Sequence, residues 1–180
     1  MELLSSKVSV NILAVIDTAA ITEVYESNKH DKKHPQKVDL DTERMICSGS
    51  RGIVSGQATA DLSFKARYGD HISIRGLSTS NNSDDAIIIY DVKWIEGDSI
   101  FKPFSCDVDA IEGAVAANPD TPNGLPPLYE ELCFSTFSSK IRRHGTAILA
   151  IQFGLYQLDD ASENQQLYGY FEWDAKITIS

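Results

Sequence analysis

Residues 169–180 read GYFEWDAKITIS, and apolar and polar side chains alternate along this stretch. Successive side chains of a strand point to opposite faces of a sheet, so a period of two predicts a strand with one buried and one solvated face. The buried face is expected to carry Phe171, Trp173, Ala175, Ile177 and Ile179, and the solvated face Tyr170, Glu172, Asp174, Lys176 and Thr178.

The same alternation occurs earlier in the chain. Residues 58–68, ATADLSFKARY, are expected to form a strand whose apolar face holds Ala58, Ala60, Leu62, Phe64, Ala66 and Tyr68. Residues 8–17 (VSVNILAVID) and 146–158 (TAILAIQFGLYQL) are apolar on both faces, which predicts strands that are central in the fold or lie at a subunit interface.

Strands separated by turn residues, with hardly any helical pattern, indicate an all-β fold. We expect an antiparallel, jelly-roll-like β-sandwich with long loops and at most one or two short helices. Residues 1–180 are expected to form a single domain. Because a sandwich covers only one face of each sheet, the two doubly apolar strands also predict a homodimer, most simply a two-fold one.

Composition excludes several partners. The net charge is -10 and the pI about 4.7, so nucleic acid and anionic membranes are poor candidates. No apolar stretch is long enough to span a membrane, and the first residues lack the pattern of a signal peptide. The odd number of cysteines, Cys47, Cys106 and Cys133, shows no metal spacing and predicts reduced, buried thiols in a cytoplasmic protein.

Two long connections have no clear strand pattern. Residues 26–43, ESNKHDKKHPQKVDLDTE, are polar and lysine-rich and are expected to form a mobile surface loop. In residues 107–131, Asp109 and Glu112 have capping-box spacing, which predicts one or two helical turns that Asn118-Pro119 would end. The four prolines of residues 118–127, NPDTPNGLPP, exclude a central strand. This second connection is either functional or covers a sheet edge.

Residues 78–85, STSNNSDD, are the candidate ligand-binding segment. They lie between two apolar runs and exceed the two to five residues that a hairpin loop needs. Asn81, Asn82, Asp84 and Asp85 supply oxygens that could hold calcium or bond to sugar hydroxyls. Four side-chain donors fall short of the six to eight that calcium prefers, so we expect weak metal binding or none. The alternative is a solvated hairpin tip.

Catalytic motifs are absent from the sequence. It holds no phosphate-binding GxxxxGK, GxGxxG, GxSxG or HExxH pattern, so neither an enzyme nor a cofactor site is expected. His30 and His34 have the spacing of a metal pair but lie in a lysine-rich stretch, and His71 and His144 are expected on the surface. Each of the two tryptophans, Trp94 and Trp173, is expected in the core.

The order of four segments resembles the PixA/AidA inclusion body protein family of bacteria. They are VNILAVIDT (10–18), SGQATADLSFKARYGDHISIRGLS (55–78), IIIYDVKW (87–94) and YGYFEWDAKITI (168–179). The resemblance implies an intracellular all-β protein that accumulates late in growth, in some members as crystalline inclusions and in others under quorum-sensing control. It implies no catalytic residues. Two hypotheses follow: a non-enzymatic protein that acts through self-association, or a lectin-like carbohydrate-binding module, possibly assisted by calcium.

Overall fold

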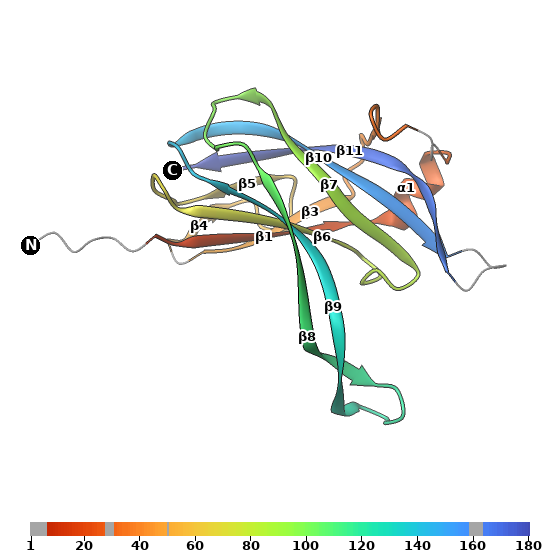
Figure 1. The fold of residues 1–180 in the computed structure, drawn as a ribbon. Helices are drawn as coiled ribbons and strands as arrows, with labels where there is room; N and C mark the ends of the chain where they lie inside the picture. Colours follow the sequence, from red (N-terminus) through yellow and green to blue (C-terminus); the bar gives the residue numbers. More distant parts are fainter. Residues whose placement is uncertain (1–6, 28–30, 50, 159–163) are drawn as a thin grey trace, which may run out of the picture.

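The computed structural model describes residues 7–27, 31–49, 51–158 and 164–180. These residues form two β-sheets packed face to face, with one short helix (Figure 1). The elements are β1 (Ser9–Ile16), α1 (Thr18–Val24), β2 (Gln36–Lys37), β3 (Glu43–Ser48), β4 (Ile53–Ser55), β5 (Asp61–Phe64), β6 (His71–Ser78), β7 (Asp85–Gly97), β8 (Ser105–Asn118), β9 (Gly124–Lys140), β10 (Gly145–Leu158) and β11 (Gln165–Ile179).

The all-β sandwich is confirmed, and its sheets are mixed. The first sheet has the order β3-β1-β6-β9-β8, and the second has the order β4-β5-β11-β10-β7, with β2 also pairing with β11. Strand β1 runs parallel to β6, and β11 runs parallel to both β5 and β2, whereas the other pairs are antiparallel. The parallel pairs arise because the intervening segments cross between the sheets before the chain returns.

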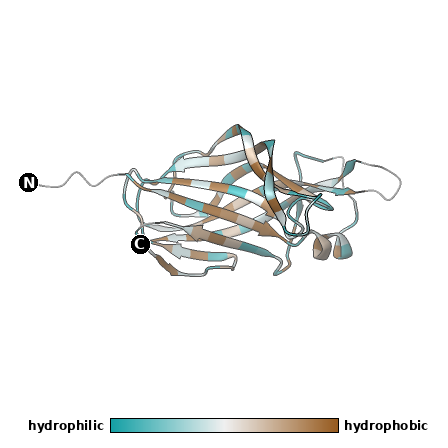
Figure 2. Ribbon diagram, turned by 90° about the horizontal axis from the view of Figure 1, so that it is seen from below, coloured by the Kyte–Doolittle hydropathy of each residue, from teal (hydrophilic) through white to brown (hydrophobic). Residues whose placement is uncertain are grey.

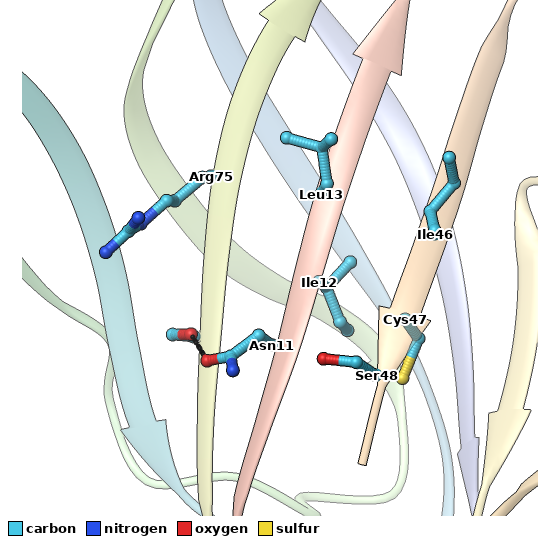
Figure 3. A pocket seen from close by; sticks show the side chains of 8 residues that line it. Asn11, Ile12, Leu13, Ile46, Cys47, Ser48 and Arg75 are labelled. Carbon is cyan, nitrogen blue, oxygen red and sulfur yellow. Dashed lines mark hydrogen bonds between the residues drawn. The ribbon is translucent and has the colours of Figure 1, made fainter. Parts of the chain in front are cut away.

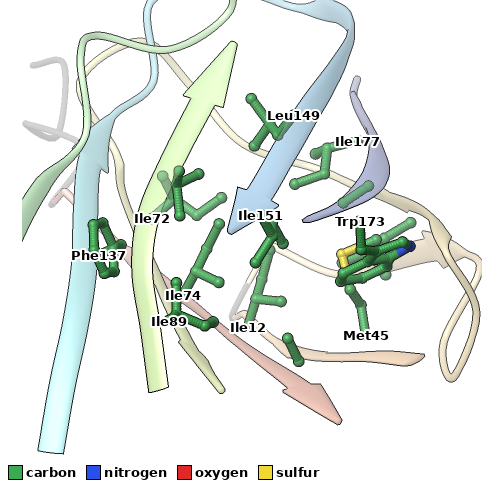
Figure 4. Packing of buried hydrophobic residues seen from close by; sticks show 14 of the residues in the cluster. Ile12, Met45, Ile72, Ile74, Ile89, Phe137, Leu149, Ile151, Trp173 and Ile177 are labelled. Carbon is green, nitrogen blue, oxygen red and sulfur yellow. The ribbon is translucent and has the colours of Figure 1, made fainter. Parts of the chain in front are cut away.

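The core lies between the inner faces of the two sheets. Figure 4 shows Ile12, Ile74 and Phe137 of the first sheet facing Ile151 and Trp173 of the second. The five apolar residues expected on the buried face of residues 169–180 are all buried, so that prediction is confirmed. In Figure 2 brown, white and teal segments follow one another along the strands of the sandwich, as the alternation of inward apolar and outward polar residues requires.

Strands β1 and β10 are central, as their doubly apolar pattern predicted. β1 lies between β3 and β6, and β10 lies between β11 and β7. The outer face of β10 is filled from within the chain: Gln152 is 5% exposed, accepts a hydrogen bond from Lys93 Nζ at 3.1 Å and donates one to Glu172 Oε2 at 2.6 Å. The side chains of neighbouring strands thus cover the second face of β10.

Two details of the strand predictions are wrong. The strand expected over residues 58–68 is shorter and forms β5 alone, since Ala58 takes a positive φ of 60°. Tyr68, expected on the apolar face, is 78% exposed. Trp94 is 56% exposed instead of buried. It pairs in register with the buried Leu149, but it lies on β7, the edge strand of the second sheet, where no further strand shields it.

The connection at 107–131 is not a loop with helical turns, and that prediction is wrong. Residues 105–140 form the long antiparallel hairpin of β8 and β9, which runs out of the sandwich (Figure 1). Asp109 and Glu112 lie in β8, where cross-strand pairing outweighs the weak local preference of a capping box. Pro126 and Pro127 lie in the outer part of β9, which pairs only with β8, so the exclusion of a central strand holds.

Part of the expected surface loop at 26–43 forms a short strand. Gln36–Lys37 pair with β11 as β2, and Val38 is buried. His30 lies outside the described residues. His34 is exposed and its Nδ1 lies 3.0 Å from Asp31 Oδ2. The helix α1 precedes this loop and begins after Asp17, whose Oδ1 accepts a hydrogen bond from the Ala20 amide at 3.2 Å.

A buried carboxyl group at the start of β3 gives the fold a pH dependence. Glu43 is 1% exposed, and burial raises its pKa above the ordinary value. The folded state therefore holds this proton more tightly than the unfolded chain. The stabilising contribution is complete below the ordinary pKa and is lost as pH rises through the raised one.

We expect the difference in unfolding free energy between the native protein and Glu43→Gln to change with pH. The native protein loses stability relative to the variant as pH rises from about 4 towards neutral, because only the native side chain ionises. Urea denaturation at a series of pH values measures this difference. A difference that stays constant over that range would show that Glu43 does not titrate in the folded state.

Candidate functional site

The polar tip between β6 and β7 is held by its own hydrogen bonds. Asn81 and Asn82 both adopt the left-handed conformation, with φ of 59° and 57°. Asn82 Oδ1 accepts hydrogen bonds from the backbone N–H of Ser78 at 2.9 Å and of Ile87 at 3.1 Å, and its Nδ2 donates to the Ile87 carbonyl at 3.3 Å. This one side chain therefore bridges the two strands across the turn.

Backbone oxygens of the tip are also occupied. The Ser78 and Ser80 hydroxyls donate to the Asp85 carbonyl at 2.6 and 2.9 Å. Gln165 Nε2, from β11, donates to the carbonyl of Ser83 at 2.7 Å and to those of Asn82 and Asp84 at 3.2 Å. These are the carbonyls that a calcium ion would need in addition to side chains.

The four predicted ligand residues are divided between two environments. Asn81 and Asp84 are exposed, whereas Asn82 and Asp85 are half-buried. Burial raises the pKa of Asp85, and a hydrogen bond with Thr18 opposes that shift. The structure therefore places two predicted ligands in solvent and uses a third to close the turn. Ligand binding here stays a prediction, and the hydrogen bonds account for the length of the loop without one.

We expect Asn82→Ala to lower the free energy of unfolding by about 1–3 kcal/mol, because it leaves the Ile87 amide without its partner. The matched variant is Asn81→Ala, which has the same backbone conformation but no side-chain bridge. Chemical denaturation of both variants separates the two contributions. Equal losses in the two variants would assign the effect to backbone strain instead of the bridge.

A shallow groove of about 420 Å³ lies on the outer face of the first sheet (Figure 3). Its floor includes Leu13 and Ile46, and Ser73 Oγ donates a hydrogen bond to Asn11 Oδ1 at 2.7 Å. Cys47 borders it but is buried, and burial raises its pKa to about 11. A thiol with that pKa stays protonated near neutral pH, so it does not provide a nucleophile here.

The hairpin of β8 and β9 exposes many large apolar side chains. We call residues 107–134 the arm; its strands stay paired from the sandwich to Asn118 and Gly124 (Figure 1). Of the fifteen large hydrophobic residues that are exposed in the described chain, seven lie in the arm. They are Val108, Ile111, Val115, Leu125, Leu128, Tyr129 and Leu132.

Both faces of the arm are apolar. The cross-strand register puts Val115 opposite Tyr129, and it puts Ile111 opposite Leu132 on the other face. Val115 and Tyr129 are 72% and 70% exposed. A two-stranded ribbon is marginally stable alone, and soluble monomers rarely expose large apolar patches. The arm therefore has the properties of a surface that another molecule covers.

The arm is also strongly acidic. It contains six carboxylates and no lysine, arginine or histidine: Asp107, Asp109, Glu112, Asp120, Glu130 and Glu131. Cys106 and Cys133 are exposed at and near its base, so the expectation of three buried thiols holds for Cys47 alone. The sequence reasoning missed the arm, although Val108 and Ala110 already alternate with acidic residues at its start.

The described part of the chain contains no group of three or more His, Cys, Asp or Glu residues that could hold a metal ion. Within the same ranges, no helix has the length and apolar character that crossing a bilayer would take.

Comparison with known proteins places the chain in a family. The family model PixA, described as inclusion body protein, matches residues 8–179. A crystal structure of an inclusion body protein (PixA) from Burkholderia cenocepacia is similar to the whole chain, with a TM-score of 0.81, 29% identity and coverage of 100% of both chains. No curated protein matches the sequence. The chain therefore belongs to the PixA family of inclusion body proteins.

Proposed function

We propose that this protein acts by self-association and accumulation, as a non-enzymatic inclusion body protein of the cytoplasm that builds up late in growth. The family description supports inclusion formation as the outcome of that association. The arm is the proposed contact surface, and the smallest assembly expected is a two-fold dimer. The observation that carries the proposal is the exposure of large apolar residues on both faces of a protruding hairpin.

Burial of the apolar side chains of the arm can offset a large part of the free-energy cost of association. Fully burying a Val or Leu side chain contributes roughly 1.5–3 kcal/mol, so covering Val108, Val115 and Tyr129 on one face would contribute about 4–9 kcal/mol. Association costs an estimated 4–15 kcal/mol in lost translational and rotational freedom. One face of the arm alone is therefore marginal. A stable assembly needs both faces, or one face together with polar contacts.

The test replaces Val108, Val115 and Tyr129 by threonine, a β-branched residue that favours strands but carries less apolar surface. We expect the native protein to show a mass above 19.8 kDa that rises with concentration, and the triple variant to remain at 19.8 kDa. Light scattering over a concentration series measures both, and far-UV circular dichroism checks the fold.

Val54→Thr is the matched control, because Val54 is also an exposed valine on a strand but lies on β4, outside the arm. It should associate like the native protein. A native protein that stays at 19.8 kDa at every concentration would reject self-association, and a triple variant that associates normally would reject this face of the arm as the contact surface. In cells, a fluorescent fusion should form foci late in growth with the native arm and stay diffuse with the triple variant.

A further inference from the structure

One end of the sandwich collects positive charge, although the whole chain is acidic. We call this surface the basic end and define it by Arg51, Lys65, Arg67, Lys102, Arg142 and Arg143. They line two neighbouring hollows of about 430 and 470 Å³. The two hollows are neighbours, because residues adjacent in sequence line different ones. Arg67 and His144 line the larger hollow, whereas Tyr68 and Arg143 line the smaller.

Two carboxylates of the described residues pair with this surface. Asp70 is buried against Arg51, and Asp98 Oδ1 lies 3.4 Å from Arg143 Nη2. Arg142 Nη1 donates to the Ser99 hydroxyl at 3.2 Å, a neutral partner that leaves the charge of the guanidinium uncompensated. Among the described residues, no carboxylate lies within ion-pair distance of Lys65, Lys102 or Arg142, so this end stays positive in a protein whose net charge is -10.

An apolar contact lies among these charges. Tyr68 is 78% exposed and lines the same hollow as Lys102 and Arg142. An aromatic ring rimmed by cations suits a ligand that is apolar and negatively charged at once. The arm has that combination, with exposed Val, Leu and Tyr side chains beside six carboxylates and no basic residue.

We infer that the arm of one copy docks on the basic end of a second copy. This inference rests on the proposed self-association and names the surface that the arm contacts. The paired strands of β8 and β9 carry the arm away from the sandwich and from the basic end of its own chain (Figure 1). Contact between two arms would bring together two sets of carboxylates without a cation, which costs free energy.

The experiment reverses charge on each surface separately. The end variant carries Lys102→Glu and Arg142→Glu, and the arm variant carries Glu112→Lys and Glu130→Lys. All four side chains are exposed, so the fold should tolerate the changes. Each variant alone should remain at 19.8 kDa where the native protein associates. An equimolar mixture should associate again, because the unchanged acidic arm of the end variant meets the unchanged basic end of the arm variant.

Lys32→Glu with Lys33→Glu is the matched control, because it changes the net charge as much as the end variant but lies outside the basic end. It should associate like the native protein, and association of native protein should weaken as salt rises. An end variant that associates normally would show contact between arms or with another face and overturn the inference, as would a mixture that stays monomeric. A native protein that never associates would overturn the proposed function itself.

Discussion

Asp70→Ala is expected to lower the free energy of unfolding by about 3–5 kcal/mol, because it removes one partner of a buried ion pair. Asp70 is 1% exposed and accepts hydrogen bonds from Arg51 Nε at 2.6 Å and Nη2 at 3.0 Å. It also accepts from the backbone N–H of Arg67 at 2.8 Å and of Val8 at 3.0 Å. One carboxylate thus joins the starts of β1 and β6 to the loop that carries Arg51.

The same site predicts a loss of stability in acid. The hydrogen bond from Arg51 lowers the pKa of Asp70 to about 2, below its ordinary value of 3.8. A carboxylate with a lowered pKa stabilises the fold above its ordinary pKa, and this contribution is lost as pH falls from about 4 to 2. Urea denaturation of native protein and Asp70→Asn at pH 7 and pH 3 measures it.

The free energy of unfolding of Asp70→Asn should fall less between pH 7 and pH 3 than that of the native protein, because the Asn side chain does not titrate. Asp84→Ala is the control, since Asp84 is exposed at the tip, and it should change stability by less than about 0.5 kcal/mol. A loss for Asp70→Ala no larger than that for Asp84→Ala would show that the buried pair contributes nothing net.

Phe171→Ala is expected to cost about 3–5 kcal/mol, the range for removing a buried aromatic side chain. Phe171 is fully buried on β11, and its ring stacks on Phe153 with centroids 6.0 Å apart and on Tyr168 at 6.3 Å. Tyr25 meets it edge-on at 6.2 Å. The cavity would therefore open at the point where four aromatic rings meet.

Phe171→Leu keeps most of the volume and should cost clearly less than the alanine variant. Tyr68→Ala removes an aromatic ring that is 78% exposed and should leave stability nearly unchanged. Chemical denaturation with a constant m-value across the series checks that only stability has changed. Comparable losses for alanine and leucine would indicate that ring stacking, and not the cavity, sets the cost.

The strands that could be predicted from sequence are those in which the alternation of apolar and polar residues matches the alternation of buried and exposed side chains. Along β11, each inward side chain meets the opposite sheet, so the alternation of residues 169–180 reports burial directly. Trp94 shows the limit of that rule. Its place on an edge strand depends on the order of strands in the sheet, which a local pattern does not contain.

The arm could not be predicted because its structure depends on pairing between distant residues. Asp109 and Glu112 have helical capping spacing, but Asp109 pairs with Phe134, which lies far along the chain. The helix forms instead after Asp17, ahead of the buried Ile21. At the tip, the sequence identified the turn-forming Asn81 and Asn82, but it could not show that the Asn82 amide bonds the turn itself.

The position of β11 constrains when this protein can fold during synthesis. β11 lies inside the second sheet, between β5 and β10, and it pairs with β5 across more than a hundred intervening residues. Until the ribosome has made the chain as far as Ile179, β5 and β10 each lack this neighbour and the second sheet is divided. The apolar faces of the earlier strands therefore stay without this neighbour in the nascent chain until β11 is available, and exposed apolar surface of that kind is prone to aggregation.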